Sequence, residues 1–348
     1  MTANGATTTT ASGPRSASLG QTPRPGALAW LTRFLRDRAQ LAGLVAVLIG
    51  LLAVFQIGNP VFLSTGNILE ILRASTLYFI VACPMTLVLV SGGLDFSAGA
   101  LFATGGVSAG LMMVAGVPWP LAVILGVGVG CALGAINAWL SVHLRVPPLI
   151  ATLGMFFVAS GTITLITSGS SVYGFPKAFT DLGQGFLLGV PFLVLYAVII
   201  GVVFWILLEK TSLGYDARAV GGNRAAASAN GIRVNRHDLI IYSMMGGIAA
   251  LAGIMGAARL SSANPAAGGT ALTFQVVTAV IIGGTSLFGG IGSIGGSALG
   301  ALLFAVINNG LVVINVNSLA QNIFVGVILV SAVAIDQFRR RRQFTSRR

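Results

Sequence analysis

Apolar stretches long enough to cross a lipid bilayer recur along almost the whole of this 348-residue chain. Only 8% of its residues are charged and 55% are hydrophobic, whereas soluble domains carry about a quarter charged residues. A globule of this composition could not cover its surface with charge. The sequence therefore predicts an all-α integral membrane protein. A spanning helix needs roughly 20 apolar residues, and the chain has room for a bundle of about ten.

The predicted spans are separated by short polar or glycine-rich turns, and eight or nine spans are the alternative count. Residues 60–74 are amphipathic and favour a short helix at the outer interface. The ten predicted spans cover about residues 40–58, 75–90, 100–116, 121–141, 149–167, 190–208, 239–258, 273–288, 293–313 and 319–335.

The basic residues are distributed unevenly between the two predicted sides. With ten spans, all 20 Lys and Arg residues except Arg73, Lys177 and Arg259 fall on one side. Because Lys and Arg accumulate on the cytoplasmic side of membrane proteins, both termini are predicted to be cytoplasmic. The same rule explains the net charge of +12 without any nucleic-acid partner.

Two polar tails flank the predicted transmembrane domain of residues 39–337. Residues 1–38 are rich in Thr, Ala, Ser, Gly and Pro, a composition that forms no core, and are predicted to be a disordered cytoplasmic tail. The first apolar run starts near residue 40, too far along the chain for a cleaved signal peptide. Residues 338–348 are predicted to be a basic cytoplasmic tail.

The most polar segment inside the domain is residues 209–238, which lies between two predicted spans. Asn223 is a good helix N-cap, the alanines that follow favour helix, and Asn230-Gly231 supplies a left-handed stop. The segment predicts a short helix with little to bury in its own protein, suited to a groove of another protein. A solvated connecting loop is the alternative.

A glycine-rich turn at residues 91–99 carries a single acidic residue, Asp95. A carboxylate at membrane depth is a candidate proton or cation site because its burial is costly. Asp95 could equally cap the following span by accepting hydrogen bonds from the N–H groups of Ser97 and Ala98. Capping is the interpretation that the sequence favours.

Two segments resemble each other and suggest an internal two-fold repeat. Around residues 87–106 and 279–300, each has an apolar run, a glycine pair, a short polar turn and a glycine-rich helix. This pattern predicts two halves of five spans each in the same orientation. The alternative is that glycine-rich membrane turns are alike by chance.

Uncharged polar residues in the spans are candidates for a solute pathway: Asn137, Gln275, Asn308 and Asn309. Hydrogen bonds between helices are the alternative role for them. The sequence shows no catalytic pattern of carboxylates, His or Cys, no metal pattern and no phosphate loop, so no enzyme activity, metal or cofactor is expected in this chain.

Four motifs together resemble the membrane-spanning permeases of ABC importers of the ribose/xylose/arabinose class. They are SGGLDFSAG at residues 91–99, PPLIATLG at 147–154, AVGGN at 219–223 with Ala225, Ala226, Gly231 and Ile232, and GGTSLFGG at 283–290. The family usually has Leu or Ile at Phe96, Val at Ala98 and Phe at Leu149, all conservative changes.

The resemblance implies a multi-pass subunit of the bacterial inner membrane that imports a monosaccharide or related polyol. It implies three protein partners: a second permease copy, a cytoplasmic ATPase that binds ATP and magnesium, and a periplasmic sugar-binding protein.

The resemblance also assigns roles to residues. The implied ATPase-coupling residues are Arg218, Gly221, Gly222, Asn223, Arg224, Ala225, Ala226, Ala227, Asn230 and Gly231. The turn motif consists of Ser91, Gly92, Gly93, Asp95, Ser97 and Gly99.

Two other transporter classes compete with this interpretation. A branched-chain amino acid permease of the same broad superfamily is the first, although the SGGLD turn favours the sugar class. An ion-coupled secondary transporter with Asp95 as its ion site is the second. It predicts uptake that survives loss of the ATPase.

Overall fold

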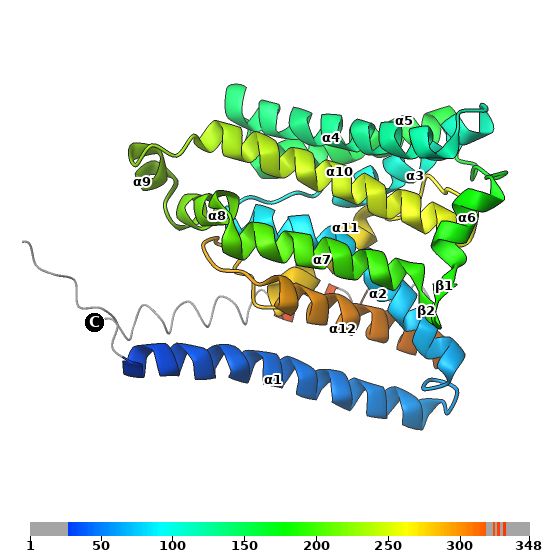
Figure 1. Cartoon of the computed structure of the whole chain (residues 1–348), viewed down its shortest axis with the longest axis horizontal. Coiled ribbons are helices and arrows are strands. Elements are labelled where there is room, and N and C mark those ends of the chain that lie inside the picture. The colour runs from blue at the N-terminus through cyan, green and yellow to red at the C-terminus, as the bar shows by residue number, and fades with distance from the viewer. Residues whose placement is uncertain (1–26, 318–322, 324–325, 328–329, 332–348) are drawn as a thin grey trace, which may run out of the picture. The chain divides into compact units, whose positions relative to one another are not determined.

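The structure is a computed structural model that describes residues 27–317 together with residues 323, 326–327, 330 and 331, with side chains from residue 42 onward. Residues 1–40 form one unit, in which residues 27–40 are helical, and residues 41–348 form a second. The described elements, traced in Figure 1, are α1 (Ala27–Gly58), α2 (Thr65–Val90), α3 (Ala98–Val114), α4 (Trp119–His143), α5 (Pro148–Thr167), α6 (Lys177–Gln184), β1 (Phe186–Leu187), β2 (Val190–Pro191), α7 (Phe192–Lys210), α8 (Ser212–Gly222), α9 (Arg224–Ala229), α10 (Val234–Leu260), α11 (Gly269–Ile282) and α12 (Ile294–Val313).

The predicted count of about ten spans is wrong. Among the described residues, six helices are long and apolar enough to cross a membrane: α2, α4, α5, α7, α10 and α12. Three further apolar helices are shorter, at Ala42–Gly58, Ala98–Val114 and Gly269–Ile282. The last has 14 residues, or about 21 Å of helix against a hydrocarbon core of about 30 Å. The two halves of five spans each are therefore not supported either.

Three segments differ from their predicted form. Residues 65–74 do not make a separate interface helix but form the first part of α2, which begins at the N-cap Ser64 and continues to Val90. The outer loop predicted at 168–189 contains α6 and part of the short antiparallel pair β1–β2. The helix expected at 273–288 ends at Ile282.

The ends of the chain fall mostly outside the described residues. Helix α1 begins at Ala27, well before the first predicted span at residue 40. Residues 27–38, predicted to be part of a disordered tail, are therefore helical. Residues 1–26 and 332–348 lie outside the described residues, as does most of the tenth predicted span, so the predictions for those tail residues remain predictions.

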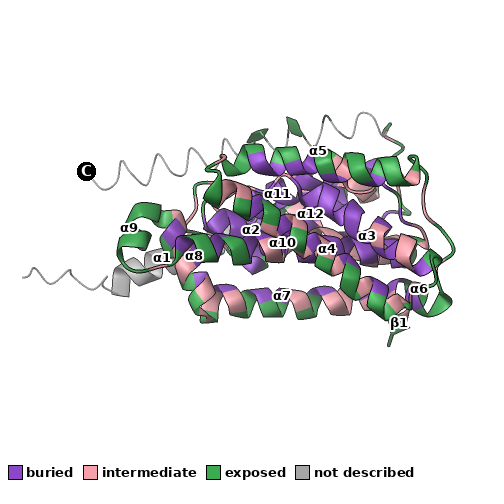
Figure 2. Ribbon diagram, turned by 90° about the horizontal axis from the view of Figure 1, so that it is seen from above, coloured by how far each residue is buried: buried purple, intermediate pink, exposed green. Residues whose placement is uncertain are grey.

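The core of the second unit is built around α2 and α10. Figure 2 shows buried residues concentrated on α2, α11 and α12, whereas α5 and α7 expose much of their length. Glycines let α10 approach α4 closely: a Cβ atom on Gly246 would lie 2.1 Å from the backbone oxygen of Gly130. The glycine pattern of the sequence thus serves helix packing, as small residues do in membrane proteins.

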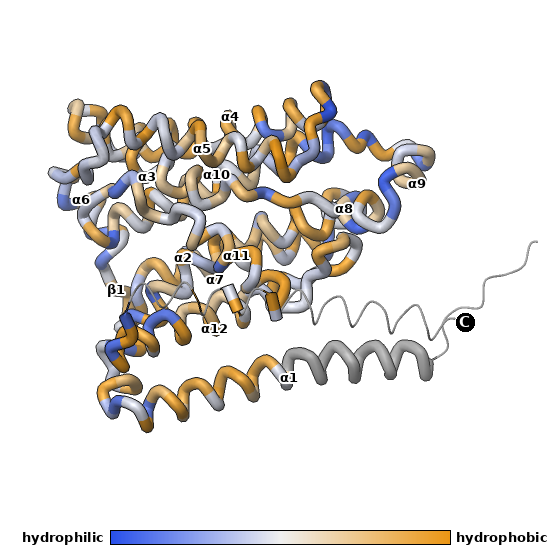
Figure 3. Tube along the Cα trace, turned by 180° about the vertical axis from the view of Figure 1, so that it is seen from behind, coloured by the Kyte–Doolittle hydropathy of each residue, from blue (hydrophilic) through white to orange (hydrophobic). Residues whose placement is uncertain are grey.

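Polar residues gather at the two ends of the second unit, visible as blue segments in Figure 3. One end is formed by α8 and α9 and is called here the α8–α9 end; the opposite end carries α6, β1 and β2 and is called the α6 end (Figure 1). Basic residues are more numerous at the first. Between residues 42 and 317, the α8–α9 end has Arg145, Lys210, Arg218, Arg224, Arg233 and Arg236, and the α6 end has Arg73, Lys177 and Arg259.

Candidate functional site

Four glycines from three separate segments meet at the α8–α9 end and form what we call the glycine junction: Gly92, Gly221, Gly289 and Gly290. A Cβ atom on Gly221 would lie 1.9 Å from the backbone oxygen of Val90 and 2.7 Å from the backbone nitrogen of Gly290. A Cβ atom on Gly289 would lie 2.8 Å from the Cα and oxygen of Gly221. Since side chains of other residues cannot fit, the three backbones touch directly.

A backbone hydrogen bond joins the two turns within this junction. The N–H of Gly290 donates to the carbonyl of Val90, the last residue of α2, over 2.8 Å. Gly92, Gly289 and Gly290 all have positive φ, which favours glycine. The two segments of the suggested sequence repeat therefore contact each other at their turns, and α8 ends on both.

Helix α8 connects the glycine junction to α7. Arg218 on α8 forms an ion pair with Glu209 near the end of α7 and donates to the carbonyl of Leu208 over 3.1 Å. Gly214 packs against the carbonyl of Leu208, with only 2.1 Å between that oxygen and the position of an added Cβ. These contacts fix α8 to the last residues of α7.

Helix α9 has the caps that the sequence predicted. The side chain of Asn223 accepts a hydrogen bond from the N–H of Ala226 over 3.0 Å, and Gly231 follows the helix with a φ of 88°. Five of its six residues are exposed; only Ala227 is buried, against Val220, Ile232 and Val234. An ion pair between Arg224 and Asp238 ties α9 to α10. Of the predicted coupling residues, Arg218, Gly221 and Gly222 thus lie on α8, and the others lie on or beside the largely exposed helix α9.

The turn at residues 91–99 is held by side chains from four helices. The N–H of Phe96 donates to Thr152 of α5 (3.1 Å), and the carbonyl of Leu94 accepts from Tyr242 of α10 (3.2 Å). The N–H of Gly99 donates to Thr273 of α11 over 2.8 Å, which satisfies a free amide at the start of α3. Ser91 hydrogen-bonds with His237 of α10 at 3.1 Å. The fourth helix, α4, contributes Asn137.

Asp95 is fully buried within this turn and accepts two hydrogen bonds from one residue. Its Oδ1 atom accepts from the N–H of Ser97 (2.8 Å) and from the Ser97 hydroxyl (2.5 Å). The expected bond from Ser97 is present, while the second donor is the hydroxyl and not the N–H of Ala98. Burial raises the pKa of Asp95 to about 6, although both Ser97 bonds lower it. The residue lies in the turn, outside the six candidate spans.

The four predicted pathway residues lie in three different places. Asn137 on α4 is fully buried and donates to the hydroxyl of Ser97 over 2.9 Å, so it belongs to the Asp95 network. Asn308 donates to the hydroxyl of Tyr78 (3.3 Å), and Asn309 exchanges two hydrogen bonds of 2.8 Å with Asn67. Gln275 is half-buried on α11. The structure therefore does not bring these four side chains together.

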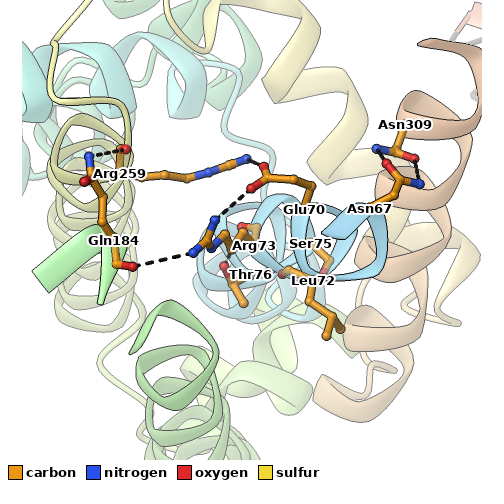
Figure 4. A network of polar contacts seen from close by, with 9 residues as sticks. All are labelled: Asn67, Glu70, Leu72, Arg73, Ser75, Thr76, Gln184, Arg259 and Asn309. Atoms are coloured by element: carbon orange, nitrogen blue, oxygen red, sulfur yellow. Dashed lines mark hydrogen bonds and ion pairs between the residues drawn. The ribbon is translucent and has the colours of Figure 1, made fainter. Parts of the chain in front are cut away.

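A charged network at the α6 end was not predicted from the sequence. Figure 4 shows Glu70 of α2 between two arginines: it pairs with Arg73 at 2.8 Å and with Arg259 at the end of α10 at 2.5 Å. Gln184 of α6 donates to the carbonyl of Arg259 over 3.0 Å, and the Arg73 guanidinium lies 4.7 Å from the centre of the Phe186 ring. The i, i+3 spacing of Glu70 and Arg73 was visible in the sequence, but Arg259 is distant along the chain.

Sequence similarity to known proteins identifies the family of this chain. Residues 67–333 match the family described as the permease component of the branched-chain amino acid transport system. The chain is 38% identical over 289 residues to the ribose import permease protein of Bacillus subtilis (strain 168), covering 82% of this chain and 89% of that protein.

Two relatives from Escherichia coli (strain K12) are similar over comparable lengths. The ribose import permease protein is 39% identical over 298 residues (84% of this chain, 92% of that protein). The D-allose transport system permease protein is 36% identical over 297 residues (85% and 91%). No solved structure gives a significant match. With this identity over most of its length, the chain belongs to the family of ABC transporter permease subunits, in the class that contains the ribose and D-allose import permeases.

Proposed function

We propose that this chain is the membrane-spanning permease of an ATP-driven, binding-protein-dependent importer of a monosaccharide of the ribose type or a related polyol. Family membership and the names of the relatives, which are ribose and D-allose permeases, support this function. The chain is a multi-pass protein of the bacterial inner membrane and a transport subunit. ATP and magnesium bind to a separate ATPase chain, which hydrolyses the ATP.

The glycine junction is the observation that carries the mechanism. An ATPase docked on the exposed face of α9 would pull or push α8, whose last residues contact both turns. When two backbone segments touch without side chains between them, a movement of one displaces the other, because packed protein interiors have low compressibility. Movement of α8 would therefore reach the end of α2 and the turn between α11 and α12 together.

The distribution of basic residues supports the orientation that this mechanism needs. The excess of Lys and Arg at the α8–α9 end favours the cytoplasm for α9, where an ATPase could reach it. The α6 end would then face the periplasm, where a sugar-binding protein would deliver the solute. A second permease copy completes the proposed assembly.

The test is uptake of a panel of radiolabelled sugars, polyols and branched-chain amino acids into cells with and without this chain. Each strain is measured with the ATPase partner intact and inactivated. Uptake of a sugar or polyol that requires both proteins supports the proposal and identifies the solute.

Two other outcomes would replace it. ATPase-dependent uptake of an amino acid with no sugar uptake would assign the chain to the amino acid class. Uptake that requires this chain, collapses with the ion gradient and survives without the ATPase would indicate a secondary transporter, with Asp95 as the candidate ion site.

A further inference from the structure

A cavity of about 370 Å³ with a mixed polar and apolar lining lies at the α8–α9 end and borders the glycine junction at Gly92. Its walls come from the end of α4, the start of α5, the turn after α2 and the α9–α10 segment. We call it the arginine cavity because Arg145 and Arg224 both line it. We propose that the arginine cavity binds the phosphate of an anionic phospholipid of the inner membrane.

The charges that line the arginine cavity favour an anion. Two arginines, Arg145 and Arg224, and one acidic residue, Asp238, line the cavity. Asp238 is paired with Arg224, whose side chain is still 54% exposed. Within residues 42–317, Arg145 has no ion-pair partner. The lining therefore keeps a net positive charge. The Arg145 guanidinium is free to donate two hydrogen bonds to the oxygens of one phosphate, whose geometry matches its planar fork.

The position of the cavity favours a lipid over a soluble anion. Arg145 lies in the turn between α4, which ends at His143, and α5, which begins at Pro148, and both helices are candidate spans. The turn is thus at the boundary of the membrane. The rings of Trp139 and His143 stack on the last turns of α4 with centroids 5.9 Å apart, and Trp is enriched at membrane interfaces.

Apolar side chains next to the cavity provide a surface for acyl chains. Leu144, Leu149 and Ile150 flank Arg145 and are all exposed, and Phe157 continues the exposed face along α5. A phosphate on Arg145 would place the lipid tails along this face. Basic pockets between transmembrane helices are a recurrent site for anionic headgroups on the cytoplasmic side.

Lipid binding can be tested without any transport assay, so its failure is distinguishable from failure of the proposed function. The purified full-length protein is titrated with phosphatidylglycerol or with phosphatidylcholine of the same acyl chains, and bound lipid is counted by native mass spectrometry. We expect preferential binding of phosphatidylglycerol. Arg145→Gln should weaken it about fivefold, since a basic residue near the surface contributes about 1 kcal/mol.

The matched control is Arg236→Gln, which removes the same charge from an exposed arginine at the same end that does not line the cavity. It should leave phosphatidylglycerol binding unchanged. Arg145→Lys keeps the charge but loses the planar fork, so its affinity for phosphatidylglycerol should fall between those of the wild type and Arg145→Gln. This variant preserves the test if Arg145→Gln unfolds, which thermal unfolding would reveal.

Four results would overturn the proposal. Equal binding of the two lipids, or equal loss in Arg145→Gln and Arg236→Gln, would show that the cavity does not select anionic lipid. Displacement of phosphatidylglycerol by inorganic phosphate at matching concentration would assign the cavity to a soluble anion. Binding that disappears when the protein dimerises would assign this face to a second copy of the chain.

Discussion

Gly221 at the end of α8 and Val90 at the end of α2 are in backbone contact, so close that a Cβ atom on Gly221 would lie 1.9 Å from the Val90 oxygen. Gly221→Ala should therefore separate α8 from α2, at a cost of about 1–3 kcal/mol for overpacking. We expect uptake to fall at least tenfold while the protein still inserts. The control change Gly128→Ala on α4 meets no atom within 4 Å and should leave uptake near wild type. Equal uptake by the two variants would refute a coupling role for the junction.

The exposed face of α9 should be sensitive to charge without affecting the fold. Ala226 is exposed, so Ala226→Glu should reduce co-purification of the ATPase several-fold at unchanged thermal stability. Ala227 is buried in the small cluster with Val220 and Val234, so Ala227→Glu should lower the melting temperature as well. Wild-type recovery of the ATPase with Ala226→Glu would contradict docking on α9.

Asp95→Asn should retain partial uptake, because an amide oxygen can still accept both bonds from Ser97. Complete loss of uptake with normal folding would instead indicate an essential charge.

The same variant carries a pH prediction. Burial raises the pKa of Asp95 from 3.8 to about 6, so its contribution to stability is complete below about pH 3.8 and is lost as the pH rises through 6. The melting temperature of Asp95→Asn minus that of the wild type should therefore increase between pH 4 and pH 7. A difference that is constant with pH would show that folding does not raise the pKa of Asp95.

Glu70→Gln should weaken the α6 end, because it leaves Arg73 and Arg259 without their shared carboxylate. The Glu70 side chain is 46% exposed, so screening limits the loss of unfolding free energy to about 1 kcal/mol. Added salt should lower the stability of the wild type more than that of the variant. Asp181→Asn, at an exposed position of α6, is the control and should leave stability unchanged. The same salt response in Glu70→Gln and wild type would argue against these ion pairs.

Local signals in the sequence predicted local structure well. The start and stop of α9 follow from Asn223 and Gly231, because a side-chain cap and a positive φ depend only on a few neighbouring residues. The hydrogen bond from the N–H of Ser97 to Asp95 was predicted on the same basis, whereas the one expected from Ala98 is replaced by the Ser97 hydroxyl. The membrane class followed from composition, which needs no tertiary information.

Helix ends at the glycine turns and contacts between distant segments could not be predicted in this way. Leu287 and Phe288 follow only four small residues after Ile282, so hydropathy averaged over a window extends α11, whereas the chain turns at Gly284 with a φ of 101°. The contact of Gly221 with Val90 and Gly290 joins residues far apart in sequence. A glycine pattern indicates that another backbone segment approaches closely, but it does not identify which segment that is.

The hydrogen bonds of the turn at residues 91–99 can form only in a fixed order while the chain is being synthesised. The partners of its backbone are synthesised progressively later: Thr152 follows Phe96 by 56 residues, Tyr242 follows Leu94 by 148, and Thr273 follows Gly99 by 174. Unsatisfied backbone groups are costly away from water. In a nascent chain the hydrogen bonds of this turn therefore stay incomplete until α11 is synthesised. A product truncated before Thr273 keeps an unsatisfied backbone N–H group, by which quality-control proteases in the membrane could distinguish it from the finished protein.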